Sequence, residues 1–298
     1  MKGTYRPYSE RTPDDQYKNL IRAILKDGIK SPSPMVDENG QEVNTIDLLG
    51  APVMRFDILK NGAPIITERE IKFWRTPIGE MLAFINGAKT QEELEQFGCK
   101  WWKMWCTEKK CAKRGLETGD LGPGSYGAAF HDFPTTEGKS FNQLAEIILQ
   151  MQERPELKTH FISPWIPQYT IRNKNHQQKV VVCPCHGWMH FRILNGKLHL
   201  VLFQRSCPSN WAQYSALLLA MSEVLDLKPG EFIHMISDAH IYENQLPWVE
   251  EILTRDSKPF PTLKINNSHD SIFDYRIEDF ELTDYEPHPG IKGIPVAI

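Results

Sequence analysis

The hydrophobic positions of the chain recur at helical spacing in several stretches. Residues 15–29 carry apolar side chains three or four positions apart and end beside Gly28, a pattern that predicts a helix. In 142–153 the apolar positions form a single stripe. The longest segment of this kind is 211–227, which is followed by Pro229-Gly230. By the same reasoning, further helices are expected over 76–84, over 91–105 and near 248–254.

Other stretches are typical of β-strands, because they are short, apolar or alternating, and bounded by turn residues. Asn195-Gly196 is a strong hairpin signal between 179–193 and 197–204. The remaining expected strands are 44–59 and 63–67, on either side of Lys60-Asn61-Gly62, and 161–171, 231–236, 240–242 and 276–282. Adjacent antiparallel strands mixed with helices favour one α+β domain over 1–298 rather than a parallel doubly wound sheet.

The composition narrows the class of protein. Of 298 residues, 41% are hydrophobic and 24% are charged, which is typical of a globular protein. A net charge of −4 gives no sign of broad binding to nucleic acid or to an anionic membrane. No run approaches the roughly 20 apolar residues of a membrane helix, and the N-terminus lacks the apolar segment of a signal peptide. We therefore expect a cytoplasmic protein, with its six cysteines as thiols. The segment 107–124, rich in Lys, Glu and Gly, is expected to be an exposed insertion loop.

Cys185 is the first candidate for chemistry, because it directly precedes His186 at the start of an expected strand. A thiol near a histidine and arginines can be held partly as the nucleophilic thiolate. A cysteine in an apolar strand is more often a small buried hydrophobe, and the residues alone leave both interpretations open. Zinc is a third interpretation, but Cys183-x-Cys185-His186 is too cramped to give three ligands, and Cys106-x4-Cys111 lacks a second pair. No metal is therefore expected.

Two strand segments carry candidate substrate ligands. Arg205 and Ser206 end an expected strand, where a guanidinium and a hydroxyl suit a phosphate. A surface salt bridge is the alternative for the arginine. Around His240 and Tyr242, in Asp-Ala-His-Ile-Tyr, polar residues alternate along a strand and could bind a sugar hydroxyl. A structural histidine would fit the same spacing.

These segments occur together in one order, and with them the chain resembles the thymidylate synthase superfamily over almost its whole length. The matching motifs are GEMLAFING (79–87), the Trp102/Trp105 pair, GDLGP (119–123) with Tyr126-Gly127, PCH (184–186), QRSC (204–207), LKPGEFIH (227–234), DAHIY (238–242), KPFP (258–261) and the tail YEPHPGIKGIPVAI. The resemblance implies an α+β thymidylate-synthase-type fold, in which a large mixed or antiparallel sheet packs against helices and forms the interface of a homodimer.

The resemblance also implies a mechanism. Cys185 would add to C6 of a pyrimidine nucleoside monophosphate, and the resulting enolate would attack 5,10-methylenetetrahydrofolate as co-substrate. Glu80 would assist proton movements, and Tyr126 would help to remove the C5 proton. The implied nucleotide ligands are Arg205 and Ser206 for the phosphate, Gln204 and Asn210 for the base, and His240 with Tyr242 for the sugar 3′-hydroxyl. Lys158 would reach the phosphate of the other subunit across the dimer interface. Trp102 and Trp105 would line the folate side, and the tail that ends at Ile298 would close the site.

Departures from the synthase pattern indicate a different product. The arginine-bearing loop is replaced by 42–47, alanines stand at 128 and 129, and the loop after Cys207 is shortened to 208–210. The segments 45–52 and 69–74 resemble phage deoxycytidylate hydroxymethylases, in which water quenches the methylene intermediate. A 5-hydroxymethyl product is therefore expected.

Two alternatives remain open. The intact Pro-Val-Ala-Ile tail favours a thymidylate synthase. A catalytically silent nucleotide- or RNA-binding member of the family would not need Cys185 or Glu80. Because Asn210 is an amide, which suits uracil better than cytosine, dUMP is the expected nucleotide.

Overall fold

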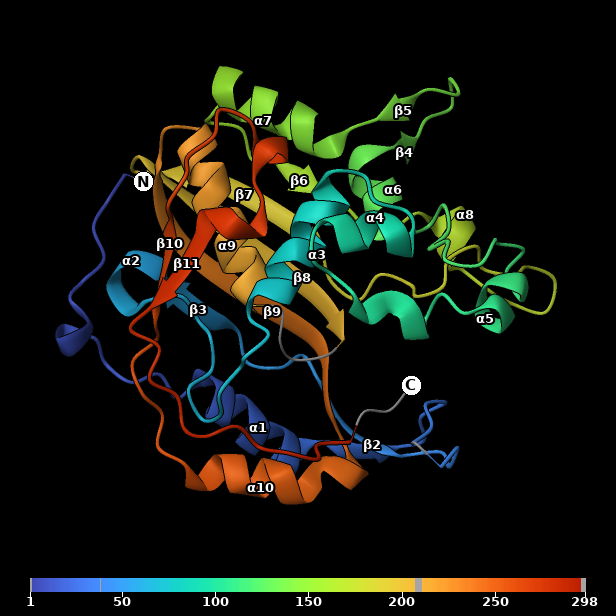
Figure 1. The fold of residues 1–298 in the computed structure, drawn as a ribbon, viewed down its shortest axis with the longest axis horizontal. Coiled ribbons are helices and arrows are strands. Elements are labelled where there is room, and N and C mark those ends of the chain that lie inside the picture. The colour runs from blue at the N-terminus through green and yellow to red at the C-terminus, as the bar shows by residue number, and fades with distance from the viewer. Residues whose placement is uncertain (1, 38, 207–210, 296–298) are drawn as a thin grey trace.

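The computed structural model describes residues 2–37, 39–206 and 211–295 (Figure 1). Within these residues, seven strands form one mixed sheet in the order β1-β2-β9-β8-β7-β6, with β3 paired to β9 as well. Only β8 and β9 run parallel among these pairs. The strands are β1 Ile29–Ser31, β2 Thr45–Leu49, β3 Met54–Asp57, β6 Phe161–Ile162, β7 Trp188–Leu194, β8 Lys197–Ser206 and β9 Lys228–Tyr242.

Helices pack against this sheet, and short paired strands lie beyond it. The α-helices are α1 Gln16–Asp27, α2 Ile58–Asn61, α3 Arg75–Ile85, α4 Gln91–Gln96, α5 Glu108–Ala112, α6 Tyr126–His131, α7 Gln143–Glu153, α8 Pro167–Thr170, α9 Trp211–Val224 and α10 Leu246–Thr254. The 3-10 helices are η1 Tyr8–Glu10, η2 Trp101–Met104, η3 Glu243–Gln245, η4 Ile272–Asp274 and η5 Ile277–Asp279. The small hairpins are β4 Phe133–Pro134 with β5 Ser140–Phe141, and β10 Thr262–Ile265 with β11 Phe280–Thr283.

The core lies between the sheet and the pair α3 and α9. Almost every residue of α9 is buried, as expected for a helix that is apolar all round. It contacts α3, β8 and β9, and Phe56, Phe84 and Phe232 are among the fully buried side chains of this core. This packing fixes α3, which carries Glu80, over the strands that carry Arg205 and His240.

The opposite face of the central strands is partly exposed. Along β8, Leu200 and Leu202 are fully buried, whereas the alternate residue Phe203 is 39% exposed. On the neighbouring β9, Met235 is 41% exposed. Because side chains alternate between the faces of a sheet, these apolar residues mark an outer face.

Much of the expected secondary structure is confirmed. Helices occur at α1, α3, α7, α9 and α10, and β7 and β8 form the hairpin expected at Asn195-Gly196. Both turn residues have positive φ, 51° and 70°, which a two-residue hairpin turn of this kind requires. The α+β fold class, with its large mixed sheet, is confirmed as well. No helix among the described residues is both long and apolar enough to cross a membrane.

Several expected elements are interrupted. The expected strand 44–59 divides into β2, β3 and α2, because the Asp57 side chain accepts a hydrogen bond from the Lys60 amide and caps a helical turn. Residues 63–67 are not a strand. The expected helix 91–105 stops at α4, because Gly98 has a φ of 81°, and resumes as η2.

Near the loops, other observed elements differ from those expected from the sequence. Segment 107–124 contains α5 and buries Cys111 and Leu121, so it is not an exposed loop throughout. The expected strand 161–171 is limited to β6 and gives way to α8, which begins at Pro167. Residues 179–187 precede β7 without joining it. Pro229-Gly230 lies within β9, which runs unbroken through 231–242. The pairing partner of β11, β10, was not foreseen.

Candidate active site

Cys185 lies in the loop before β7, directly against the end of β8. The backbone amide of Arg205 donates to the Cys185 carbonyl at 2.6 Å, which ties the loop to the strand. The Arg205 side chain then turns back, and Nη2 lies 3.0 Å from the Cys185 sulfur. The positive charge of the guanidinium therefore lies directly beside the sulfur. The structure therefore brings together the two residues that the sequence marks as nucleophile and phosphate ligand.

Tyr126, the first residue of α6, holds the cysteine loop from the other side. Its hydroxyl oxygen accepts hydrogen bonds from the backbone amides of Cys185, at 2.7 Å, and His186, at 3.4 Å. Its ring stacks between Phe84 and His186, with both centroids 4.6 Å away. Burial is the main reason why the pKa of Tyr126 lies well above its ordinary value, and the nearby Cys185 sulfur raises it further. The phenol is therefore protonated at neutral pH, and its oxygen lies directly beside the backbone of Cys185.

Glu80 is a buried carboxylate on α3. The indole nitrogens of Trp101 and Trp102 donate to its Oε1 at 2.7 and 2.6 Å. Burial raises the pKa of Glu80 to about 7, although the two indole hydrogen bonds act to lower it. A group with this pKa is present in both protonation states at neutral pH, as general acid–base chemistry requires. The contribution of Trp101 was not foreseen, because nothing in the sequence shows that two adjacent indoles converge on one oxygen.

His186 does not assist Cys185 as its neighbouring position suggests. Its side chain points into the core, where Nδ1 lies 2.5 Å from the Tyr214 hydroxyl. Burial, with a smaller effect of His234, lowers the pKa of His186 to about 3. The imidazole is neutral and already engaged, so the expectation that this histidine supports a thiolate is wrong. Arg205 is the group that contacts the sulfur.

Gln204 lies behind the site in a fixed polar chain. The Trp211 indole donates to Nδ1 of His234 at 2.8 Å, so Nε2 of His234 carries the proton toward Oε1 of Gln204, at 2.9 Å. The Gln204 amide nitrogen donates to the Ser206 carbonyl at 2.9 Å. Gln204 is fully buried, and this hydrogen bond ties its side chain to the end of β8. His234 and Trp211 were not singled out from the sequence.

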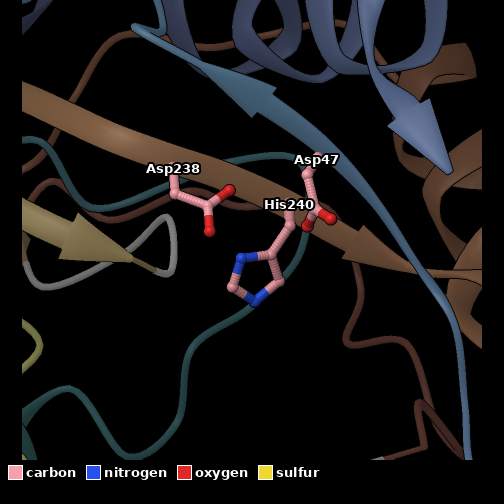
Figure 2. Close-up of side chains that lie close together, drawn as sticks. All are labelled: Asp47, Asp238 and His240. Carbon is pink, nitrogen blue, oxygen red and sulfur yellow. The ribbon is translucent and has the colours of Figure 1, made fainter. Parts of the chain in front are cut away.

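Three titratable side chains meet where β2 pairs with β9. Asp47 stands opposite His240 in the antiparallel register, and Asp238 precedes His240 by two residues on the same strand. Figure 2 shows the carboxylate of Asp238 and the ring of His240 approaching a common space from β9, with Asp47 coming from β2. One ligand atom from each lies within 4.8 Å of the others, so this is the group that could hold a cation. Asp47 was missed because a strand aspartate is usually solvated.

This cluster belongs to the same site as Cys185. Ser206, beside Arg205 at the end of β8, stands opposite Asp238 in the parallel register. Burial raises the pKa of Asp238, and the negative charge of Asp47 adds to that effect, while His240 and Arg205 oppose it. The ring of Tyr242 lies edge-on to His240, with 5.5 Å between centroids. Cys185, the phosphate candidates and the sugar candidates therefore lie together at one end of β8 and β9.

Two cavities share the lining residues Tyr17 and Arg69, and the first of them reaches the end of β9. One of about 220 Å³ is lined by His240, Tyr242, Trp248 and Ile294. The C-terminal tail borders it, because Gln245 and Trp248 donate to the carbonyls of Pro295 and Lys292 at 2.9 and 3.0 Å. A second, of about 130 Å³, is lined mainly by apolar side chains, among them Phe73, Trp74, Trp101 and Trp211.

The remaining expected residues lie in different parts of the structure. Trp102 is buried against Glu80, whereas Trp105 is half-buried with the Lys110 ammonium 4.4 Å from its ring. Lys158 precedes β6, where its carbonyl lies 3.1 Å from Nε2 of His190, and no described contact joins it to Arg205 in the same chain. Asn210, the loop 208–210 and Ile298 lie outside the described residues.

The model of a family described as thymidylate synthase matches residues 15–298. The match includes α1 and reaches the last residue of the chain, so it covers every residue of the site described above.

Proposed function

The chain belongs to the thymidylate synthase family, whose members transfer a folate-borne one-carbon unit to C5 of a pyrimidine nucleotide, and from that premise we propose that it converts dUMP to 5-hydroxymethyl-dUMP. In this proposal methylenetetrahydrofolate supplies the carbon and water completes the reaction. The alternative within the family is methylation, with the hydride of tetrahydrofolate in place of water.

The proposed chemistry begins at Cys185. Its thiolate, held by Arg205 at 3.0 Å, adds to C6 of the base and moves an electron pair toward O4. C5 then attacks the methylene carbon of the folate. A water molecule that the Tyr126 phenol orients takes the C5 proton, and tetrahydrofolate departs with the electron pair of its bond to the transferred carbon, which leaves an exocyclic methylene on the nucleotide. Water adds to that carbon, its proton passes to Glu80, and the Cys185 sulfur leaves C6.

Glu80 is the observation that carries the one-carbon transfer, and the departures from the synthase pattern at 42–47, 128 and 129 favour water in its last step. A carboxylate with a pKa of about 7, buried beside two indoles, can accept a proton from water and return it within one cycle. At Ala129 on α6 the synthase pattern has a glutamine, so the side chain is smaller here. The tail supports the alternative, because the contacts of Gln245 and Trp248 hold it over the cavity beside His240, as a water-excluding synthase would need.

The two products are separated by the fate of the folate. With dUMP and methylenetetrahydrofolate, we expect nucleotide turnover without the rise near 340 nm that dihydrofolate gives. Mass analysis should show a 5-hydroxymethyl product and tetrahydrofolate in equal amounts. The Cys185→Ala variant is the control and should give neither. Dihydrofolate formed in proportion to dTMP would replace this proposal by thymidylate synthase, and no release of tritium from C5 would indicate a binding protein.

We include a homodimer in the proposal. Phe203 and Met235 expose apolar surface on the outer face of the sheet, which a second copy would bury. Lys158, at the edge of the same sheet, has no described contact with Arg205 in its own chain, so it could serve the site of the partner.

A further inference from the structure

Two cysteines flank a proline just before β7, in the tripeptide Cys183-Pro184-Cys185. Both cysteines are partly exposed, so a small solute can reach each thiol from solvent. The other cysteines that the structure describes are buried: Cys99, Cys106 and Cys111. Among the described residues, Cys183 is therefore the one accessible thiol that accompanies Cys185.

The tripeptide is short enough for its two sulfurs to be joined. Pro184 holds φ at about −65°, and a chain of that conformation rises about 3.1 Å per residue, whereas a fully extended chain rises at most about 3.6 Å. The Cα atoms of Cys183 and Cys185, two residues apart, are therefore separated by roughly 6–7 Å. A disulfide joins Cα atoms about 4.4–6.8 Å apart. Rotation of the side chains with little backbone movement can therefore close the bond.

The contacts of the tripeptide bring both thiols under the same guanidinium. The Cys185 sulfur lies 3.5 Å from the Cys183 carbonyl oxygen, so it is folded back along the chain toward Cys183. Nη2 of Arg205 lies 3.0 Å from the Cys185 sulfur, and its Nε donates to the Pro184 carbonyl at 3.3 Å. Burial raises the pKa of Cys183, while the charge of Arg205 opposes that effect and the nearby Cys185 sulfur adds to it. The two sulfurs therefore share one electrostatic environment.

A weak contact holds the Cys183 thiol where it is. Its sulfur donates to the Thr170 carbonyl at 3.4 Å, and a thiol is a weak hydrogen-bond donor. Breaking this contact costs little compared with forming a covalent bond between the two sulfurs. Cys183 takes no part in the proposed one-carbon transfer, so its side chain can turn toward Cys185 without removing a group that the reaction needs.

We propose that Cys183 and Cys185 form a reversible redox-modification site, in which a peroxide oxidises Cys185 and Cys183 converts the product to a disulfide. The Cys185 thiolate attacks one oxygen of hydrogen peroxide, the O–O bond breaks, and the departing hydroxide takes a proton from solvent to become water. Two electrons have then passed from the sulfur to the peroxide, and the sulfur carries a hydroxyl group as a sulfenic acid. The Cys183 thiol attacks that sulfur, the S–O bond breaks, and the hydroxide leaves as water with the thiol proton.

The disulfide would stop the reaction and protect the nucleophile at the same time. Without a second thiol nearby, further peroxide converts a sulfenic acid to sulfinic and sulfonic acids, which thiols do not reduce. A disulfide is instead restored to two thiols by a dithiol, which becomes oxidised to its own disulfide. The inference rests on the proposed function only in taking Cys185 as the nucleophile, and it does not depend on which product is formed.

The test exposes the full-length protein to hydrogen peroxide, blocks the remaining thiols with N-ethylmaleimide and digests the protein with trypsin. Trypsin cuts after Lys179 and Arg192, so Cys183 and Cys185 lie in one peptide, 180–192. We expect this peptide to lose two hydrogen atoms at the cysteines and to take up no maleimide. Dithiothreitol should then restore both thiols and most of the C5 tritium release.

Cys183→Ser removes the second thiol at nearly constant size. It should release tritium about as fast as the wild type before oxidation. After peroxide its Cys185 should carry two or three oxygen atoms, and dithiothreitol should restore less than about a tenth of the activity. Cys111→Ala, which removes a buried thiol on α5, is the matched control and should recover as the wild type does.

The possible outcomes separate this inference from the proposed function. A wild type that recovers no better than Cys183→Ser would overturn the redox site, as would oxygen atoms on Cys185 without loss of the two hydrogens. A disulfide that joins two chains on a non-reducing gel would overturn it as well. Because the peptide mass is measured without nucleotide, a protein that forms the disulfide but releases no tritium before oxidation would refute the proposed function and leave the redox site standing.

Discussion

Replacing Glu80 with Gln should change the stability of the protein in a way that depends on pH. Burial raises the pKa of Glu80 from 4.5 to about 7, so the folded protein holds this proton more tightly than the unfolded chain does. Such a group contributes stability that is complete below the unfolded pKa and is lost as pH rises through the folded pKa. Gln is neutral at every pH, and its amide oxygen can still accept from Trp101 and Trp102. The Glu80→Gln variant therefore does not lose this stability as pH rises.

The size of the effect follows from these two pKa values. At pH 5 the folded protein is almost fully protonated at Glu80 and the unfolded chain mostly is not, whereas at pH 8 both are ionised. Linkage then gives a loss of roughly 2–3 kcal/mol from the wild type between pH 5 and pH 8, and none from the variant. The difference in unfolding free energy, variant minus wild type, should therefore become more positive by this amount.

Urea unfolding followed by tryptophan fluorescence measures this difference at both pH values. Glu92→Gln, an exposed carboxylate on α4, is the control and should give the same difference from wild type at pH 5 and at pH 8. A Glu80→Gln difference that stays constant, or that falls as pH rises, would show that Glu80 is not held protonated by burial. The acid–base role proposed for it would then lose its physical basis.

Three further substitutions test the candidate nucleophile and the outer face of the sheet. Cys185→Ala should abolish C5 tritium release, whereas Cys183→Ala should retain most of it, since the Cys183 thiol donates to the Thr170 carbonyl at 3.4 Å; comparable losses would contradict the assignment. Met235→Asp places a charge on the exposed apolar face of β9 and should convert the proposed dimer to a monomer in light scattering. A Met235→Asp monomer with full activity at nanomolar concentration would argue against a shared site.

The sequence predicts the elements whose signals are local. The helical stripe in α7 and the Asn195-Gly196 turn depend on residues within a few positions of one another, and both are found where expected. The breaks at Asp57 and Gly98 depend on a side-chain cap and on one backbone angle, so periodicity alone could not reveal them.

The sequence predicts which residues belong to the candidate site, but it does not predict which of them contact one another. Cys185 and Arg205 were found through motifs, and the structure places them 3.0 Å apart. Adjacency in sequence suggested His186 as the partner of Cys185, but neighbouring side chains in extended backbone point in different directions, and this one enters the core. The pKa of Glu80 depends on burial by distant segments, so no local pattern could give it.

The antiparallel pairing of β2 with β9 has a consequence for folding during synthesis. Asp47 stands opposite His240, so Asp47 leaves the ribosome nearly 200 residues before its partner in the sheet. At a translation rate of about 5–20 residues per second, β2 waits roughly 10–40 seconds for β9. During that time β1 can pair with β2 on one edge only, and the other edge stays open to any extended segment nearby. The nascent chain is therefore exposed to mispairing and aggregation at β2, the strand that later completes the candidate active site.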